Sequence, residues 1–129
     1  MSETPRTANS LAVFAGGVVG SALRVSVGDL FPPTTGGFPL TVLVINLVGS
    51  FILGVYLGRQ EYRPGRSWSR PFWAAGLLGS FTTFSAFSLD VVFLVSAQSA
   101  LAAVVYVIGS VAGGVAVAWG GLRAGRSLR

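Results

Sequence analysis

The sequence contains no cysteine and no histidine among its 129 residues. These absences exclude disulfide frameworks, thiolate metal sites, cysteine nucleophiles and histidine general bases. Charge is also scarce, because Asp, Glu, Lys and Arg together make up 10% of the chain, against about 25% in soluble domains. Apolar residues are abundant instead, at 52% of the chain, and the mean hydropathy is +0.71. These proportions are typical of a membrane protein and argue against a soluble enzyme.

Four apolar stretches are each long enough to cross a bilayer, which requires about 20 residues in a helix. No charged residue occurs between Leu30 and Gly58 or between Val91 and Leu122. The first apolar stretch could be the core of a signal peptide, but three similar stretches follow, so a transmembrane helix is the better interpretation. We therefore predict an all-α membrane protein with one four-helix transmembrane domain over residues 1–129. The predicted spans are approximately 10–28, 39–58, 72–95 and 99–121.

The positive charges are all arginines, and they are distributed unevenly around these spans. With four spans, both termini and the loop between the second and third spans lie on one side of the membrane. That side contains eight arginines, whereas the loops of the other side contain none. The positive-inside rule then predicts that both termini are cytoplasmic and that the chain is a multi-pass protein of the cell membrane. Because the arginines flank the spans, topology explains them without nucleic-acid binding.

Glycine is frequent, with 18 residues, and much of it falls within the predicted helices. Small residues spaced four apart allow two helices to approach closely, within one chain or between chains. A bundle of four helices is thin, so dimerisation is the natural way for it to enclose a polar path. The three pairs with this spacing are Gly16 and Gly20, Gly54 and Gly58, and Gly109 and Gly113.

Several polar residues fall at membrane depth, where they are costly and therefore candidates for function. Asn46 lies in the middle of the second span. It could bridge two helices or line a polar path, and both interpretations stay open. Tyr106 and Ser110 are one helical turn apart in the last span and are expected to share a face. A serine can also bond to its own helix backbone, so Ser110 alone is a weak signal.

The third span is interrupted by consecutive glycine, serine and threonine residues between positions 79 and 85. Such residues favour turns and caps over a continuous apolar helix. We expect a break near the centre of this span, with freed carbonyl groups that line a cavity or hold an ion. Phe84 and Phe87 share a face just after the break. An aromatic pair with this spacing is usually core packing, but the surrounding hydroxyl groups favour a polar path.

The segment GSFTTFSAF at residues 79–87 closely resembles the G-x-x-T-T-F-S-T-F signature of the CrcB/Fluc fluoride channels. Three further segments are similar to blocks of that family in the same order and spacing. They are GGVVGSALR at residues 16–24, NLVGSFILG at residues 46–54 and YVIGS at residues 106–110. The resemblance covers all four spans.

This resemblance implies a fluoride-selective ion channel that exports fluoride passively and lowers its cytoplasmic concentration. It also implies an inverted (antiparallel) dimer with a structural, non-transported sodium ion at its centre. The sodium would be held by the backbone carbonyls of Gly79 and Thr82. Arg24 matches a vestibule position, although it could equally be an arginine that snorkels to the interface. The implied pore-lining positions are Asn46, Thr83, Phe84, Ser85, Phe87, Tyr106 and Ser110.

The chain departs from the family pattern at four positions, and their effect on conduction stays open. Ala86 and Gly114 replace hydroxyl-bearing residues, Val42 stands where threonine is common, and Asp90 replaces the usual glutamate. The arginine bias predicts one main orientation and an oppositely biased sister subunit, while a homodimer is the alternative.

The main alternative function is a small multidrug-resistance-type exporter, which is also a four-helix dimer. Such a proton-coupled pump requires a carboxylate within the membrane. The first span carries Arg24 and no acid, and Asp90 is the only acidic residue within a predicted helix. No nucleophile and base pair is visible, so we do not expect an enzyme.

Overall fold

The chain is almost entirely helical in a computed structural model that describes residues 6–32, 37–97 and 99–128. Its elements are α1 (Arg6–Leu30), α2 (Leu40–Gln60), the π-helical segment η1 (Pro71–Leu78), α3 (Gly79–Phe81), α4 (Phe84–Ser96) and α5 (Ala100–Ser127). The third span consists of η1, α3 and α4 in succession. Four spans are long and apolar enough to cross a membrane, which confirms the predicted all-α class and the predicted number of spans.

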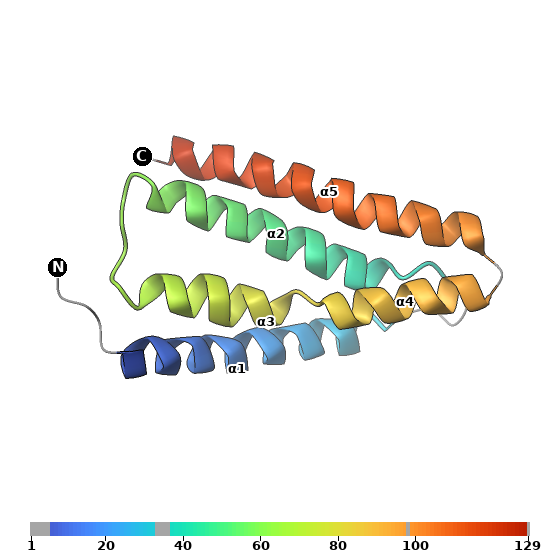
Figure 1. Ribbon diagram of the computed structural model, residues 1–129, viewed down its shortest axis with the longest axis horizontal. Coiled ribbons are helices and arrows are strands. Elements are labelled where there is room, and N and C mark those ends of the chain that lie inside the picture. Colours follow the sequence, from blue (N-terminus) through green and yellow to red (C-terminus); the bar gives the residue numbers. More distant parts are fainter. Residues whose placement is uncertain (1–5, 33–36, 98, 129) are drawn as a thin grey trace.

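The helices extend beyond the predicted spans at both ends of the chain. α1 begins at Arg6 and α5 ends at Ser127, where hydropathy placed the ends near residues 10 and 121. Hydropathy marks only the part that fits the hydrocarbon layer, and the polar turns continue the same helices beyond it. The start of α1, the loop from α2 to η1 and the end of α5 lie at one end of the molecule (Figure 1). This arrangement places the described arginines, apart from Arg24, at that end.

Glycines bring the helices together in two tightly packed pairs, α1 with η1 and α2 with α5 (Figure 1). A Cβ atom on Gly20 would overlap the carbonyl oxygen of Leu77, and one on Gly54 would overlap that of Ala118. Only a residue without a side chain permits this approach. The predicted packing role of the first two glycine pairs is therefore confirmed.

The third glycine pair does not pack as a unit within the chain. A Cβ atom on Gly113 would lie 3.2 Å from Leu47 of α2, whereas one on Gly109 would meet nothing within 4 Å. Within this chain the close contacts of α5 with α2 are made further along, at Gly121 and Gly125. Close packing between chains at Gly109 and Gly113 stays a prediction.

The third span is broken at two extended residues, as predicted. Thr82 has φ −75° and ψ 155°, and Thr83 has φ −144° and ψ 124°, so the backbone leaves the helix at Phe81 and re-enters it at Phe84. Figure 1 shows this break between α3 and α4, at mid-length of the molecule.

Most apolar side chains point outward, and few are buried within the chain. The buried cluster in the described part contains Leu94, Ala103 and Tyr106, against which Phe38 and Phe87 pack. In a helical membrane protein, outward apolar side chains face lipid, and this surface fits that environment.

Candidate functional site

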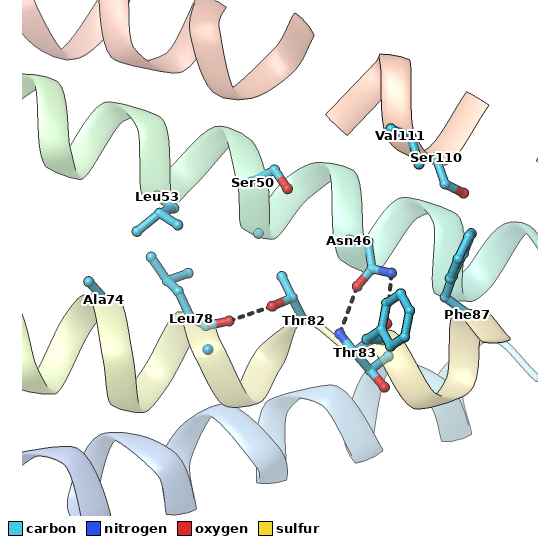
Figure 2. Close-up of a pocket in the computed structure, with 13 residues that line it drawn as sticks. Asn46, Ser50, Leu53, Ala74, Leu78, Thr82, Thr83, Phe87, Ser110 and Val111 are labelled. Atoms are coloured by element: carbon cyan, nitrogen blue, oxygen red, sulfur yellow. Dashed lines mark hydrogen bonds between the residues drawn. The ribbon is translucent and has the colours of Figure 1, made fainter. Parts of the chain in front are cut away.

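A cavity of about 330 Å³ lies where the break in the third span faces α2 and α5. Figure 2 shows side chains from α2, from both sides of the break and from α5 around it. Much of its wall is apolar, from residues such as Leu53, Leu78 and Val111. Seven predicted site residues line it: Asn46, Gly79, Thr82, Thr83, Phe84, Phe87 and Ser110.

Asn46 holds the break from the opposite helix. Its Oδ1 atom accepts a hydrogen bond of 2.8 Å from the backbone N–H of Thr83, and its Nδ2 atom donates one of 3.0 Å to the Thr83 carbonyl (Figure 2). The amide therefore satisfies both backbone groups of an extended residue that has left the helix. Asn46 bridges two helices and also lines the cavity, so both interpretations of this residue hold.

Thr83 begins the second half of the span as the N-cap of α4. Its hydroxyl oxygen accepts a hydrogen bond of 3.2 Å from the backbone N–H of Ala86 and lies 3.2 Å from the Ser85 hydroxyl. A threonine at this position is a preferred N-cap because it satisfies one free N–H of the first turn. The local sequence thus restarts the helix within the membrane.

The same hydrogen bonds free two carbonyl groups. In a continuous helix the N–H of residue i+4 donates to the carbonyl of residue i. The Thr83 N–H bonds Asn46 in place of the Gly79 carbonyl, and the Ala86 N–H bonds the Thr83 hydroxyl in place of the Thr82 carbonyl. Gly79 and Thr82 therefore lose their helical donors, and their carbonyl oxygens keep capacity for another partner.

The aromatic residues form a stack that starts at the cavity and runs away from it. The rings of Phe84 and Phe87 are 5.8 Å apart, and Phe87 stacks on Tyr106 at 5.4 Å. Phe84 is 79% exposed, whereas Tyr106 is completely buried. The Tyr106 hydroxyl donates a hydrogen bond of 2.8 Å to Oδ2 of Asp90. Tyr106 therefore supports Phe87 from behind and does not line this cavity.

Two serines line the cavity on facing helices. The Oγ atom of Ser110 is buried and has no hydrogen-bond partner in the described part of the chain. Ser50 lies on α2 one turn beyond Asn46 and lines the same cavity (Figure 2). Ser50 was missed as a site residue, although its position four residues after Asn46 on the same helix was a usable signal.

A second, smaller cavity of about 170 Å³ contains Arg24 and Asp90. Thr83 lines this cavity as well as the larger one. Arg24 and Asp90 both line this cavity, but they do not form an ion pair. The single ion pair among the described residues joins Glu61 and Arg126. Arg24, Ser85 and Tyr106 do not line the larger cavity. The vestibule role of Arg24 and the pore-lining roles of Ser85 and Tyr106 therefore stay predictions.

Three of the residues that depart from the family pattern lie in or near these two cavities. Val42 and Ala86 line the smaller cavity, and a Cβ atom on Gly114 would lie 4.0 Å from the Ser50 hydroxyl.

Four membrane-length helices around a polar break define a small multi-pass membrane protein. The family model described as CrcB-like protein, Camphor Resistance (CrcB), matches residues 11–122, and the chain belongs to this family.

Curated relatives agree with this assignment. The chain is 43% identical over 109 residues to a protein of Methylobacterium sp. (strain 4-46), covering 84% of this chain and 88% of the relative. It is 41% identical over 118 residues to one of Paracoccus denitrificans, covering 92% and 94%, and 38% identical over 117 residues to one of Oceanobacillus iheyensis, covering 89% of each. Each of these relatives is named fluoride-specific ion channel FluC.

Proposed function

We propose that the chain is a fluoride-selective channel that lets fluoride leave the cell passively, and that it has no catalytic activity. The observation that carries the proposal is the helix break that Asn46 holds beside a cavity lined by hydroxyl groups and phenylalanine rings. Relatives of similar length and about 40% identity carry the name of fluoride-specific channels. An interior-negative membrane potential drives an anion outward by about 2.3 kcal/mol per 100 mV, so no energy coupling is needed.

The chemistry of the site suits a small anion. Moving a carboxylate-sized ion into low dielectric costs on the order of 20 kcal/mol before relaxation, and the smaller fluoride ion costs more. Donors must replace the lost water. Asn46 uses one Nδ2 hydrogen on Thr83 and has a second, Ser110 supplies a buried hydroxyl, and the ring edges of Phe84 and Phe87 are electropositive. A narrow path between such groups would reject larger halides.

The proposed assembly is an antiparallel dimer. Phe84 is 79% exposed next to the cavity, so a second subunit over this face would complete the wall. The arginine bias supports insertion mainly with the termini in the cytoplasm and an oppositely biased sister subunit, with a homodimer as the alternative.

A structural sodium ion fits the carbonyl groups that the break sets free. The oxygens of Gly79 and Thr82 lose their helical donors and would hold the ion, which suits a hard cation with oxygen ligands. When bound, sodium supplies a fixed positive charge beside the path.

Fluoride efflux from liposomes that contain this chain, alone and together with an oppositely biased sister subunit, is followed with a fluoride electrode and tests the function. We expect fluoride to leave and chloride to stay. Equal passage of the two ions would overturn the selective channel. A fluoride flux as large as that of a sample with an added sister subunit would overturn the heterodimer and leave the homodimer.

A further inference from the structure

The arginine-rich end of the molecule contains an amphiphilic groove that is separate from the fluoride site. Its cavity volume is about 490 Å³, and it lies between the last turns of α2, the following loop, η1 and Leu128 at the end of α5. Arg59 and Arg63 line its outer part, and Ile52, Val55 and Trp73 line its apolar part.

Hydrogen bonds build the wall of this groove from the chain itself. The Tyr56 hydroxyl lies 2.9 Å from the Ser69 hydroxyl, which ties the loop to α2, and Gln60 donates to the Tyr56 hydroxyl. The backbone N–H of Arg63 donates a bond of 3.0 Å to the carbonyl of Arg59, so the two arginines sit on one continuous turn. The groove is therefore preformed.

The two groove arginines have no acidic partner within the described residues. Glu61 lies between them in sequence, but both of its oxygens bond Arg126, at 2.8 and 2.9 Å. This is the single ion pair of the described residues. Two guanidinium groups thus line the groove without a carboxylate partner in the described part of the chain. Guanidinium groups bind phosphate in a planar, two-point geometry.

The apolar part of the groove lies deeper along the membrane span than the arginines. Ile52 precedes Arg59 by seven residues on α2, which corresponds to about 10 Å along a helix. The charged part therefore lies at the end of a span, where lipid headgroups are found, and the apolar part reaches toward the acyl chains.

We propose that this groove binds one anionic phospholipid, with its phosphate at Arg59 and Arg63 and the upper part of an acyl chain along Ile52, Val55 and Trp73. Topology alone accounts for arginines at this end of the chain, but it requires neither a preformed cavity nor an apolar floor beneath them. Charge complementarity and the direction of the groove together select an anionic lipid as the occupant. The groove does not share residues with the site at Asn46 except for Leu78.

Native mass spectrometry of the full chain in detergent tests the proposal. The probe is palmitoyl-oleoyl phosphatidylglycerol, and phosphatidylcholine with the same chains is the lipid control. The test variant is Arg59→Gln with Arg63→Gln. Arg63→Gln alone is the single-charge variant, and its matched control is Arg66→Gln, which removes one positive charge from the same loop but not from the wall of the groove. Glycerol 3-phosphate, which has the headgroup chemistry without acyl chains, serves as a competitor.

We expect one retained phosphatidylglycerol per chain in preference to phosphatidylcholine. Binding should weaken about fivefold for each groove arginine removed, as for basic residues at an anionic membrane surface. Arg66→Gln should bind as the unchanged chain does. Three outcomes would each overturn the proposal. They are equal weakening by Arg66→Gln, equal retention of the two lipids, and displacement by glycerol 3-phosphate at concentrations near those of the lipid. The comparison of phosphatidylglycerol with phosphatidylcholine and the competition with glycerol 3-phosphate both use the unchanged chain. They therefore test the proposal even if a variant fails to fold. Fluoride efflux is not part of this readout, so a failure here leaves the proposed function intact.

Discussion

The side-chain amide of Asn46 and the backbone of Thr83 exchange two hydrogen bonds, of 2.8 and 3.0 Å, across 37 positions of sequence. This exchange replaces the helical bonds that the backbone N–H and carbonyl of Thr83 give up at the break. One side chain on α2 thereby stabilises the interruption of the neighbouring span.

Replacing Asn46 by aspartate keeps the shape of the side chain and removes its donor. The Thr83 carbonyl loses its partner, and a buried acceptor without a partner costs about 1–3 kcal/mol. We expect fluoride efflux to fall about tenfold or more, because a carboxylate beside the path repels the anion, and about 1.4 kcal/mol of repulsion corresponds to a factor of ten. The efflux assay in liposomes measures this, with protein recovery as the control for folding. Wild-type efflux from Asn46→Asp would contradict the role given to this amide.

Replacing Phe84 by isoleucine should separate function from stability. Because Phe84 is 79% exposed, its loss should change the midpoint of thermal unfolding little while it reduces fluoride efflux strongly. Phe93→Ile is the matched control, since Phe93 lies on the same helix α4 and is 62% exposed but does not line the cavity. Equal efflux from the two variants would show that an exposed ring on α4 is not specific to conduction.

The pair of Tyr106 and Asp90 should contribute to stability. In Tyr106→Phe the ring can still stack on Phe87, but the Asp90 carboxylate loses its 2.8 Å donor. The expected loss is about 1.5–3 kcal/mol, the range for hydrogen bonds to charged groups. Unfolding of Tyr106→Phe, Asp90→Ala and the double variant measures the coupling between the two groups. Strictly additive effects would show that the hydrogen bond does not stabilise the fold.

Two neighbouring glycines of α5 should respond oppositely to alanine. A Cβ atom on Gly121 would overlap the Phe51 carbonyl oxygen of α2, whereas one on Gly120 would meet nothing within 4 Å. We expect Gly121→Ala to destabilise the chain. Gly120→Ala should be neutral or stabilising by up to about 1 kcal/mol, from helix propensity. Thermal unfolding in one detergent compares the two, and equal effects would count against the close packing of α2 on α5.

The exposed pair of Glu61 and Arg126 should be sensitive to acid. The hydrogen bond from Arg126 lowers the pKa of Glu61 below its ordinary value of 4.5. A lowered folded-state pKa means that the contribution is fully present above 4.5 and is lost as the pH falls through the lower value. The difference in unfolding midpoint between the unchanged chain and Glu61→Gln should therefore be small at neutral pH and vanish in acid. A difference that grows in acid would contradict the pairing.

The break could be predicted from the sequence because its cause is local. Consecutive glycine, serine and threonine residues favour caps and turns, and Thr83 caps α4 with its own hydroxyl. The partner that stabilises the break could not be predicted in the same way. Asn46 was found as a polar residue at membrane depth, but its bonds to Thr83 depend on how two spans pack.

The spacing of residues along a helix was also not enough to predict which of them line the cavity or contact another helix, because this depends on how neighbouring helices pack. Tyr106 and Ser110 are one turn apart, yet Tyr106 is buried behind Phe87 while Ser110 lines the cavity. Similarly, the spacing of Gly109 and Gly113 does not reveal which part of α5 contacts α2. The π-helical form of η1 has no recognisable signal in the sequence.

Thr83 belongs to the walls of both cavities. Thr83 is the one described residue that lines both the cavity of Asn46 and the cavity of Arg24. A substitution of Thr83 would therefore reshape both cavities at once and would also alter the cap at which α4 begins.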